Sequence, residues 1–218
     1  MKVLVLGATG GTGQRIVQEA LAQGYKVTAL VRSLAKGEAI FPNIKTLFPE
    51  LKLIQGDALD REVVAGALSG CDGVISALGT GLSLFHEVTV LSDATRTMIE
   101  AMRQQSVYRL VCITGMGAGD SRGHGGFIYD RLILPFVLGK IYRDKDRQEA
   151  EIRASNLDWT IVRPSYLTNG PATGNIRVTT NLAGIRGGSI ARADVANFVV
   201  GEFLQKEWLY KSPLITSI

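Results

Sequence analysis

Short runs of apolar residues alternate along the chain with segments whose apolar residues recur at helical spacing. The apolar runs predict strands near residues 2–6, 26–31, 51–55, 72–77, 108–114 and 157–162. The helically spaced segments predict helices near residues 12–23, 60–68, 86–105, 140–154 and 193–206. Strands that alternate with helices indicate βαβ units, and therefore a parallel sheet covered by helices on both faces.

Right-handed crossover connections between these elements narrow the topology further. They give an α/β fold of the Rossmann-like, doubly wound kind, with strand order 3-2-1-4-5-6 in a single domain over residues 1–218. Ligands bind such a sheet at the carboxyl ends of its strands. We therefore expect the ligand site at that edge, with substrate loops after the fourth, fifth and sixth strands.

Two segments interrupt the alternation. Residues 41–50 read "FPNIKTLFPE", and their two prolines predict that the second crossover helix is short or broken. Residues 115–127 read "GMGAGDSRGHGGF" and follow the fifth strand directly. We expect this glycine-rich stretch to be a flexible loop at the ligand crevice, where such loops often act as lids.

Composition excludes several classes of protein. With 46% hydrophobic and 20% charged residues, the chain can bury one sizeable core. A net charge of +4 without a basic stripe argues against nucleic-acid binding. Two cysteines, Cys71 and Cys112, and two histidines, His86 and His124, predict neither a disulfide framework nor a metal site. No apolar segment approaches the ~20 residues of a membrane span, so we expect a cytoplasmic protein. We also expect a monomer.

A glycine cluster lies between the first predicted strand and the first predicted helix. Its spacing is Gly7-x-x-Gly10-x-x-Gly13. Glycines let the backbone approach a pyrophosphate, and the helix N-terminus offers free N–H groups to the anion. The predicted contacts are Gly7, Thr9, Gly10, Gly11, Thr12 and Gly13. The alternative interpretation is a bare turn between a strand and a helix.

The end of the second predicted strand distinguishes the two nicotinamide cofactors. A carboxylate there binds the ribose 2′-hydroxyl of NAD, whereas an arginine accommodates the 2′-phosphate of NADP. The sequence reads "TALVRSLAK", which places Arg32 at this position with Ser33 and Lys36 beside it. We therefore predict NADP(H) as the cofactor, the alternative being a surface arginine without a partner.

Five blocks in the same order resemble a known superfamily. They read "GATGGTG", "VRS", "GDALD", "ISALGT" and "SNLDWTIVRPSYL". The chain resembles the atypical short-chain dehydrogenase/reductase superfamily and, within it, the NmrA-like group, which includes flavin and biliverdin reductases. The resemblance runs from Lys2 to the segment "ARADVANFVV".

The resemblance implies further cofactor contacts. It assigns Asp57 and Ala58 to the adenine ring, Ala77, Leu78, Gly79 and Thr80 to the ribose and nicotinamide half, and Pro164, Ser165 and Tyr166 to the nicotinamide side. Lys145, with Glu149 one helical turn later, resembles the K-x-x-x-E helix of the family. The lysine of that helix commonly contacts the nicotinamide ribose.

Departures from the superfamily pattern bear on the chemistry. Short-chain dehydrogenases use a Tyr-x-x-x-Lys pair, but Ile141 stands four residues before Lys145. Tyr142 stands three residues before it, and that spacing also shares a helix face. The serine usual after the fifth strand is replaced by Thr114, followed by Gly115. These differences disfavour alcohol dehydrogenation driven by a tyrosine acid.

The remaining chemistry is direct hydride transfer to a planar acceptor. We predict an NADPH-dependent reductase of a flavin (FMN or riboflavin) or of a biliverdin-type linear tetrapyrrole, with Thr114 orienting the substrate or the carboxamide. Met116, Phe127 and Tyr166 are candidate substrate walls, although each suits a packing role equally well. A non-catalytic NADP(H)-binding sensor or assembly factor and another short-chain reductase or epimerase are the alternatives.

Overall fold

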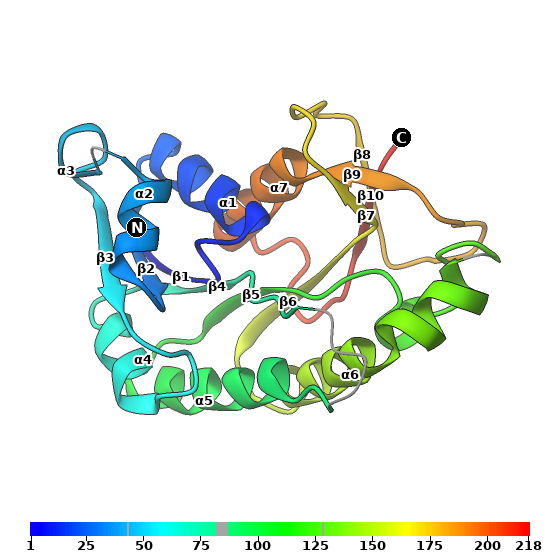
Figure 1. Ribbon diagram of the computed structural model, residues 1–218, viewed down its shortest axis with the longest axis horizontal. Helices are drawn as coiled ribbons and strands as arrows, with labels where there is room; N and C mark the ends of the chain where they lie inside the picture. Colours follow the sequence, from blue (N-terminus) through cyan, green and yellow to red (C-terminus); the bar gives the residue numbers. More distant parts are fainter. Residues whose placement is uncertain (43, 82–86, 128) are drawn as a thin grey trace.

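The computed structural model describes residues 1–42, 44–81, 87–127 and 129–218, and its largest element is an eight-stranded sheet (Figure 1). The strands are β1 (Lys2–Leu6), β2 (Lys26–Val31), β3 (Leu51–Gln55), β4 (Gly73–Ser76), β5 (Arg109–Ile113), β6 (Asp158–Pro164), β7 (Tyr166–Thr168), β8 (Ile176–Thr179), β9 (Ser189–Ala191) and β10 (Leu214–Ser217). The helices are α1 (Gly11–Ala22), α2 (Leu34–Ile40), α3 (Ile44–Leu47), α4 (Arg61–Leu68), α5 (Val90–Gln104), α6 (Gly139–Arg153) and α7 (Arg192–Gln205). A short 3-10 helix, η1 (Gly119–Ser121), and a π-helix, η2 (Tyr129–Leu138), precede α6.

The predicted topology is confirmed. The order in the large sheet is β3-β2-β1-β4-β5-β6-β10-β8, and its first six strands are parallel. The sheet extends beyond the prediction, because β10 adds in parallel to β6 and β8 pairs antiparallel with β10. Strands β7 and β9 form a separate two-stranded sheet. These four strands span three or four residues each, which is too short for a recognisable alternation.

Helices cover both faces of the large sheet, with α1 and α7 on one face and α4, α5 and α6 on the other (Figure 1). Strand β1 needs this cover because it carries apolar side chains on both faces of the sheet. Val3 and Val5 lie in the core beneath α1 and α7, whereas Leu4 and Leu6 lie in the core against α4 and α5.

The two interrupted segments have different outcomes. Helix α2 ends at Ile40 and α3 is a single turn, so the prediction of a short or broken crossover is confirmed. The stretch after β5 differs from the expected flexible loop. Residues 115–118 are buried, the Met116 N–H donates to the Pro164 carbonyl, and the Gly119 N–H donates to Asp146. This first part of the loop is a packed element, not a lid.

Two further differences concern helices. The third predicted helix begins only at Val90, because residues 87–89 are not helical. Residues 82–86, including His86, lie outside the described residues. Helix η2 was not predicted, because Pro135 interrupts its helical pattern. Along the described chain, no helix has the length and apolar character needed to cross a membrane.

Candidate cofactor and active site

A groove of about 900 Å³ opens along the carboxyl ends of the central strands. Its volume lies in the range of small-molecule sites. It brings together most of the site residues predicted from the sequence: Gly7, Thr9, Gly10, Gly11, Thr12, Arg32, Lys36, Asp57, Ala58, Ala77, Leu78, Gly79, Thr80, Thr114 and Lys145.

The glycine turn at one end of the groove is built by close backbone approach. Gly7 has φ +78°, and a Cβ there would lie 2.4 Å from the Ala77 carbonyl oxygen. A Cβ on Gly13 would lie 2.1 Å from the Gly7 carbonyl oxygen, so Gly13 supports the turn from beneath instead of lining the groove. Helix α1 starts directly after Gly10, with no side-chain cap and no acidic residue in its first turn. Its free N–H groups therefore suit an anion.

Two cations lie at the end of β2. Arg32 and Lys36 are exposed and line the groove, and neither forms an ion pair within the residues that the structure describes. Ser33 is not among the lining residues; its hydroxyl accepts a hydrogen bond from the Lys36 N–H at 3.3 Å and caps α2. Ser33 thus positions the helix that carries Lys36.

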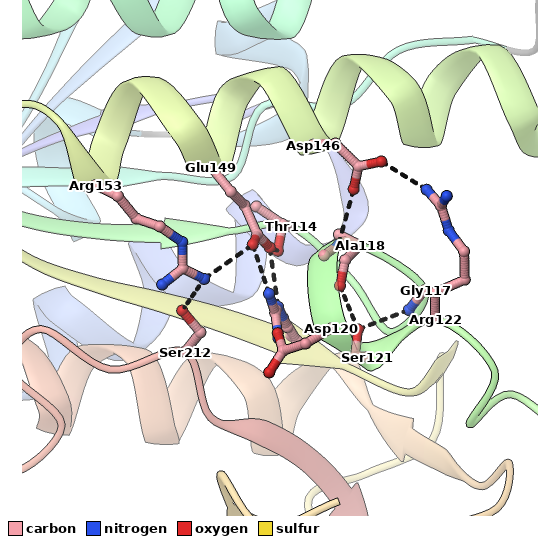
Figure 2. Close-up of polar contacts among 12 residues, drawn as sticks. Thr114, Gly117, Ala118, Asp120, Ser121, Arg122, Asp146, Glu149, Arg153 and Ser212 are labelled. Carbon is pink, nitrogen blue, oxygen red and sulfur yellow. Dashed lines mark hydrogen bonds and ion pairs between the residues drawn. The ribbon is translucent and has the colours of Figure 1, made fainter.

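The groove ends at Thr114, whose side chain is buried. Figure 2 shows this residue with Glu149, whose carboxylate accepts a hydrogen bond from the Thr114 hydroxyl at 2.8 Å. Glu149 also accepts two hydrogen bonds from Arg163, at 2.9 and 2.6 Å, and one from Arg153 at 3.2 Å. A carboxylate held by two guanidinium groups can only accept, and a hydroxyl has one hydrogen. The Thr114 hydroxyl therefore has only acceptor capacity left for a ligand.

Lys145 approaches the same point from α6, where its Nζ donates to the Thr114 carbonyl oxygen. Burial lowers the pKa of Lys145 to about 8, while the nearby Cys112 and Glu149 act in the opposite direction. Near pH 7 the side chain therefore remains an ammonium, close to the pH at which it loses its charge.

Tyr142, the tyrosine nearest to Lys145 along α6, is paired with a second phenol. It is buried, does not line the groove, and its hydroxyl lies 2.9 Å from the hydroxyl of Tyr129. Burial raises the pKa of Tyr142, with the neighbouring Tyr129 acting in the same direction. A phenol in this setting is a packing group of α6.

Other residues predicted from the sequence lie outside the groove. Pro164 is buried at the end of β6, and the hydroxyl of Ser165 is 3.0 Å from that of Thr216. Met116 is also buried and packs against Ile185. The side chains of these residues therefore pack within the fold behind the groove.

Phe127 and Tyr166 are on the surface instead. They are 77% and 72% exposed, and neither lines the groove. The guanidinium of Arg131 lies 5.9 Å from the ring centroid of Phe127. Their role as substrate walls stays a prediction, since these rings can reach only an acceptor that projects beyond the groove.

The structure adds lining residues that the sequence patterns did not indicate. They are Leu6, Leu30, Val31, Gly56, Leu59, Gly81, Val90, Leu91, Ala94, Ile113, Leu167 and Arg192. Several of them lie at the end of a predicted strand or directly after it, so the positions of the strand ends could have indicated these residues. Arg192 and Leu167 come from the C-terminal part of the chain, and no local pattern connects them to the glycine turn.

A second cavity, of about 570 Å³, lies on the other side of Glu149. Four of its charged groups are paired with one another. Arg163 contacts Asp120 and Glu149, and Arg153 contacts Glu149 and Ser212 (Figure 2). Among the described residues, no group of three or more His, Cys, Asp and Glu side chains could hold a metal ion.

Comparisons with known proteins identify relatives of the chain. The profile of a protein family described as NAD(P)H-binding matches residues 7–206. An uncharacterised chloroplastic protein of Arabidopsis thaliana is 31% identical over 214 residues, covering 96% of this chain and 74% of that protein. The uncharacterised sugar epimerase YhfK of Bacillus subtilis is 29% identical over 208 residues, covering 94% and 89%.

A solved structure gives a similar result at the level of the fold. ChuY, an anaerobillin reductase from Escherichia coli O157:H7, matches with a TM-score of 0.81 at 26% identity, covering 100% of this chain and 97% of ChuY. The family resemblance inferred from the sequence motifs is thereby confirmed.

Proposed function

The chain belongs to the NAD(P)H-binding family, and on that premise we propose that it is an NADPH-dependent reductase of a flavin or a linear tetrapyrrole. The family match supports a nicotinamide cofactor without distinguishing NADP from NAD. The acceptor is likewise our inference from the chemistry of the groove.

The groove fits a dinucleotide. At Gly7 and Gly13 a side chain would occupy the space of the turn, and the start of α1 offers unpaired N–H groups beside it. Arg32 and Lys36 would hold a 2′-phosphate, and Lys145 would contact the nicotinamide ribose. When bound, the cofactor supplies a hydride.

The hydrogen bond from Thr114 to Glu149 carries the proposal for the acceptor. Reduction of a simple ketone or aldehyde needs a donor aimed at the developing alkoxide. The one hydroxyl hydrogen of Thr114 is already donated to Glu149, and Tyr142 does not line the groove. The Lys145 ammonium, the remaining donor near Thr114, is assigned above to the nicotinamide ribose. A flavin or tetrapyrrole spreads the incoming charge over a conjugated ring and can take its proton from water.

The remaining acceptor capacity of Thr114 suits the same ligands. It can receive a hydrogen bond from the carboxamide of the cofactor or from a ring N–H of a flavin or pyrrole. The groove lining includes small or aliphatic side chains, among them Ala77, Leu91, Ala94 and Ile113. Such a surface accommodates a flat ring. The likeness to ChuY, an anaerobillin reductase, supports this acceptor class.

An epimerase is the second candidate, favoured by the similarity to YhfK, which is named a sugar epimerase. Epimerisation through a keto intermediate needs a group that removes and returns a hydroxyl proton. Ile141 stands where the superfamily tyrosine would do this. The proposed reductase avoids that requirement.

An acceptor panel distinguishes the candidates. Purified protein is mixed with NADPH and, separately, FMN, biliverdin, a simple aldehyde and a nucleotide sugar, while nicotinamide absorbance and sugar products are followed. The proposal expects turnover with FMN or biliverdin only. Epimerised sugar would support the second candidate, and tight NADPH binding without any turnover would indicate a sensor or assembly factor.

A further inference from the structure

Gly11 is a glycine of the cluster that the turn itself does not explain. Gly7 needs its positive φ, and Gly13 needs its close backbone approach. Gly11 is the first residue of α1 and has no positive φ. A Cβ on Gly11 would instead lie 3.0 Å from Nε and 3.2 Å from Cδ of Arg192. The missing side chain at position 11 leaves room for this arginine.

Arg192 presents a charge to the groove without a countercharge. It is the first residue of α7, is half-buried and lines the groove. Its guanidinium donates to the Asn169 side-chain oxygen at 2.7 Å and the Leu167 carbonyl at 3.4 Å, both neutral acceptors. The nearby acid Asp194 accepts its hydrogen bonds from residues 173–174. Within the described part of the chain, Arg192 forms no ion pair.

Two sources of positive potential therefore meet at one place. The start of α1 contributes unpaired N–H groups, and Arg192 contributes a guanidinium from the start of the neighbouring helix α7. A partly desolvated cation gains most from an anion that accepts two parallel hydrogen bonds, as a phosphate does.

We propose that Arg192 binds the pyrophosphate of the cofactor and holds it against the start of α1. This inference rests on the proposed NADPH-dependent function. It adds a phosphate-binding residue from the C-terminal part of the chain to a site otherwise built from the N-terminal glycine turn. It also explains Gly11, whose role is to make space for the guanidinium.

The test measures ligand affinity of the full chain after Arg192→Gln, which removes the charge and keeps a polar side chain of similar shape. Three probes are used: NADPH, 2′-phospho-ADP-ribose, which contains the pyrophosphate but no nicotinamide, and adenosine 2′-phosphate, which lacks the pyrophosphate. We expect NADPH and 2′-phospho-ADP-ribose to bind about 10- to 100-fold more weakly. Adenosine 2′-phosphate should bind as it does to the wild type.

The outcomes separate this inference from the proposed function. Wild-type protein that does not bind NADPH would reject the function itself. Wild-type affinity for NADPH in Arg192→Gln would overturn the inference alone. An equal loss for adenosine 2′-phosphate would assign Arg192 a structural role. A loss for NADPH without a loss for 2′-phospho-ADP-ribose would place its anion on another part of the ligand.

Gly11→Ala tests the spatial half of the inference. Alanine favours the helix more than glycine does, so the melting temperature should stay the same or rise. The displaced guanidinium should weaken NADPH binding about 2- to 10-fold. Gly66→Ala in α4 is the matched control, because nothing lies within 4 Å of its added Cβ. Equal NADPH affinities in the two variants would overturn the role assigned to Gly11.

Discussion

The groove and the ionic cluster behind Glu149 contain similar cations in opposite situations. We define the ionic cluster as Asp120, Glu149, Arg153 and Arg163, which are joined by ion pairs between 2.5 and 3.2 Å. In the groove, the side chains of Arg32, Lys36 and Arg192 form no ion pair with any described residue. The cluster neutralises its own charge, whereas the groove presents positive charge to a ligand.

The difference indicates which charges stabilise the fold and which remain available to bind a ligand. Arg163 is almost fully buried, and removing such a cation from water is tolerable only with a paired carboxylate. Burial raises the pKa of Asp120, but the hydrogen bond and charge of Arg163 outweigh burial and lower it, so the pairing favours the ionised carboxylate. Of the two cavities, the groove is therefore the one in which we propose that the ligand binds.

The largest expected effect comes from breaking the ionic cluster. Arg163→Met leaves the buried carboxylate of Glu149 without its two-point partner, and should lower the free energy of unfolding by about 3–5 kcal/mol. Urea denaturation measures this loss. Arg153→Met is the control, because its side chain is 43% exposed and should contribute about 1 kcal/mol or less. Equal losses in both variants would contradict the distinction.

A groove cation should affect binding and leave stability unchanged. Arg32→Asp should weaken NADPH binding at least about 10-fold, because a 2′-phosphate then meets a carboxylate. NADH should bind as well as before or better, since a carboxylate suits the 2′-hydroxyl. Titration with both cofactors checks this, with Arg32→Gln as the variant that loses NADPH without gaining NADH. Equal weakening of both cofactors would remove the assignment of Arg32 to the 2′-phosphate.

Thr114 connects the two regions, and its removal should have a moderate effect. Thr114→Val keeps the shape but deletes a hydroxyl that accepts from the ligand, so kcat should fall about 3- to 10-fold. Steady-state kinetics with FMN or biliverdin measure the change, and Thr114→Ser should retain most activity. A fall of several orders of magnitude would mean that Thr114 acts as an acid, contrary to its bond with Glu149.

The smallest effect concerns pH. With a pKa of about 8, Lys145 is an ammonium below that pH and a neutral amine above it. NADPH affinity should therefore fall about two- to fivefold as the pH rises from about 7 to 9. Lys145→Arg should flatten this dependence, because a guanidinium keeps its charge throughout. An unchanged slope in Lys145→Arg would assign the dependence to another group.

The sequence predicted the parts of the site that are encoded locally. The glycine turn, the six parallel strands and the position of Arg32 each follow from a few consecutive residues. The bond between Thr114 and Glu149 and the approach of Arg192 to Gly11 depend on side-chain directions and on packing between distant elements. The buried first part of the loop after β5 was misjudged for the same reason, since its glycines pack against α6 and the Arg163 side chain.

The central claim is hydride transfer from NADPH to a planar acceptor, in a groove where the Thr114 hydroxyl already donates its hydrogen bond to Glu149. The most direct measurement mixes wild-type protein, NADPH and FMN or biliverdin without oxygen and follows the nicotinamide and acceptor absorbances together. We predict that one acceptor is reduced for each NADPH consumed, at a rate far above the protein-free mixture. NADPH that binds tightly while both absorbances stay constant with each acceptor would contradict the account.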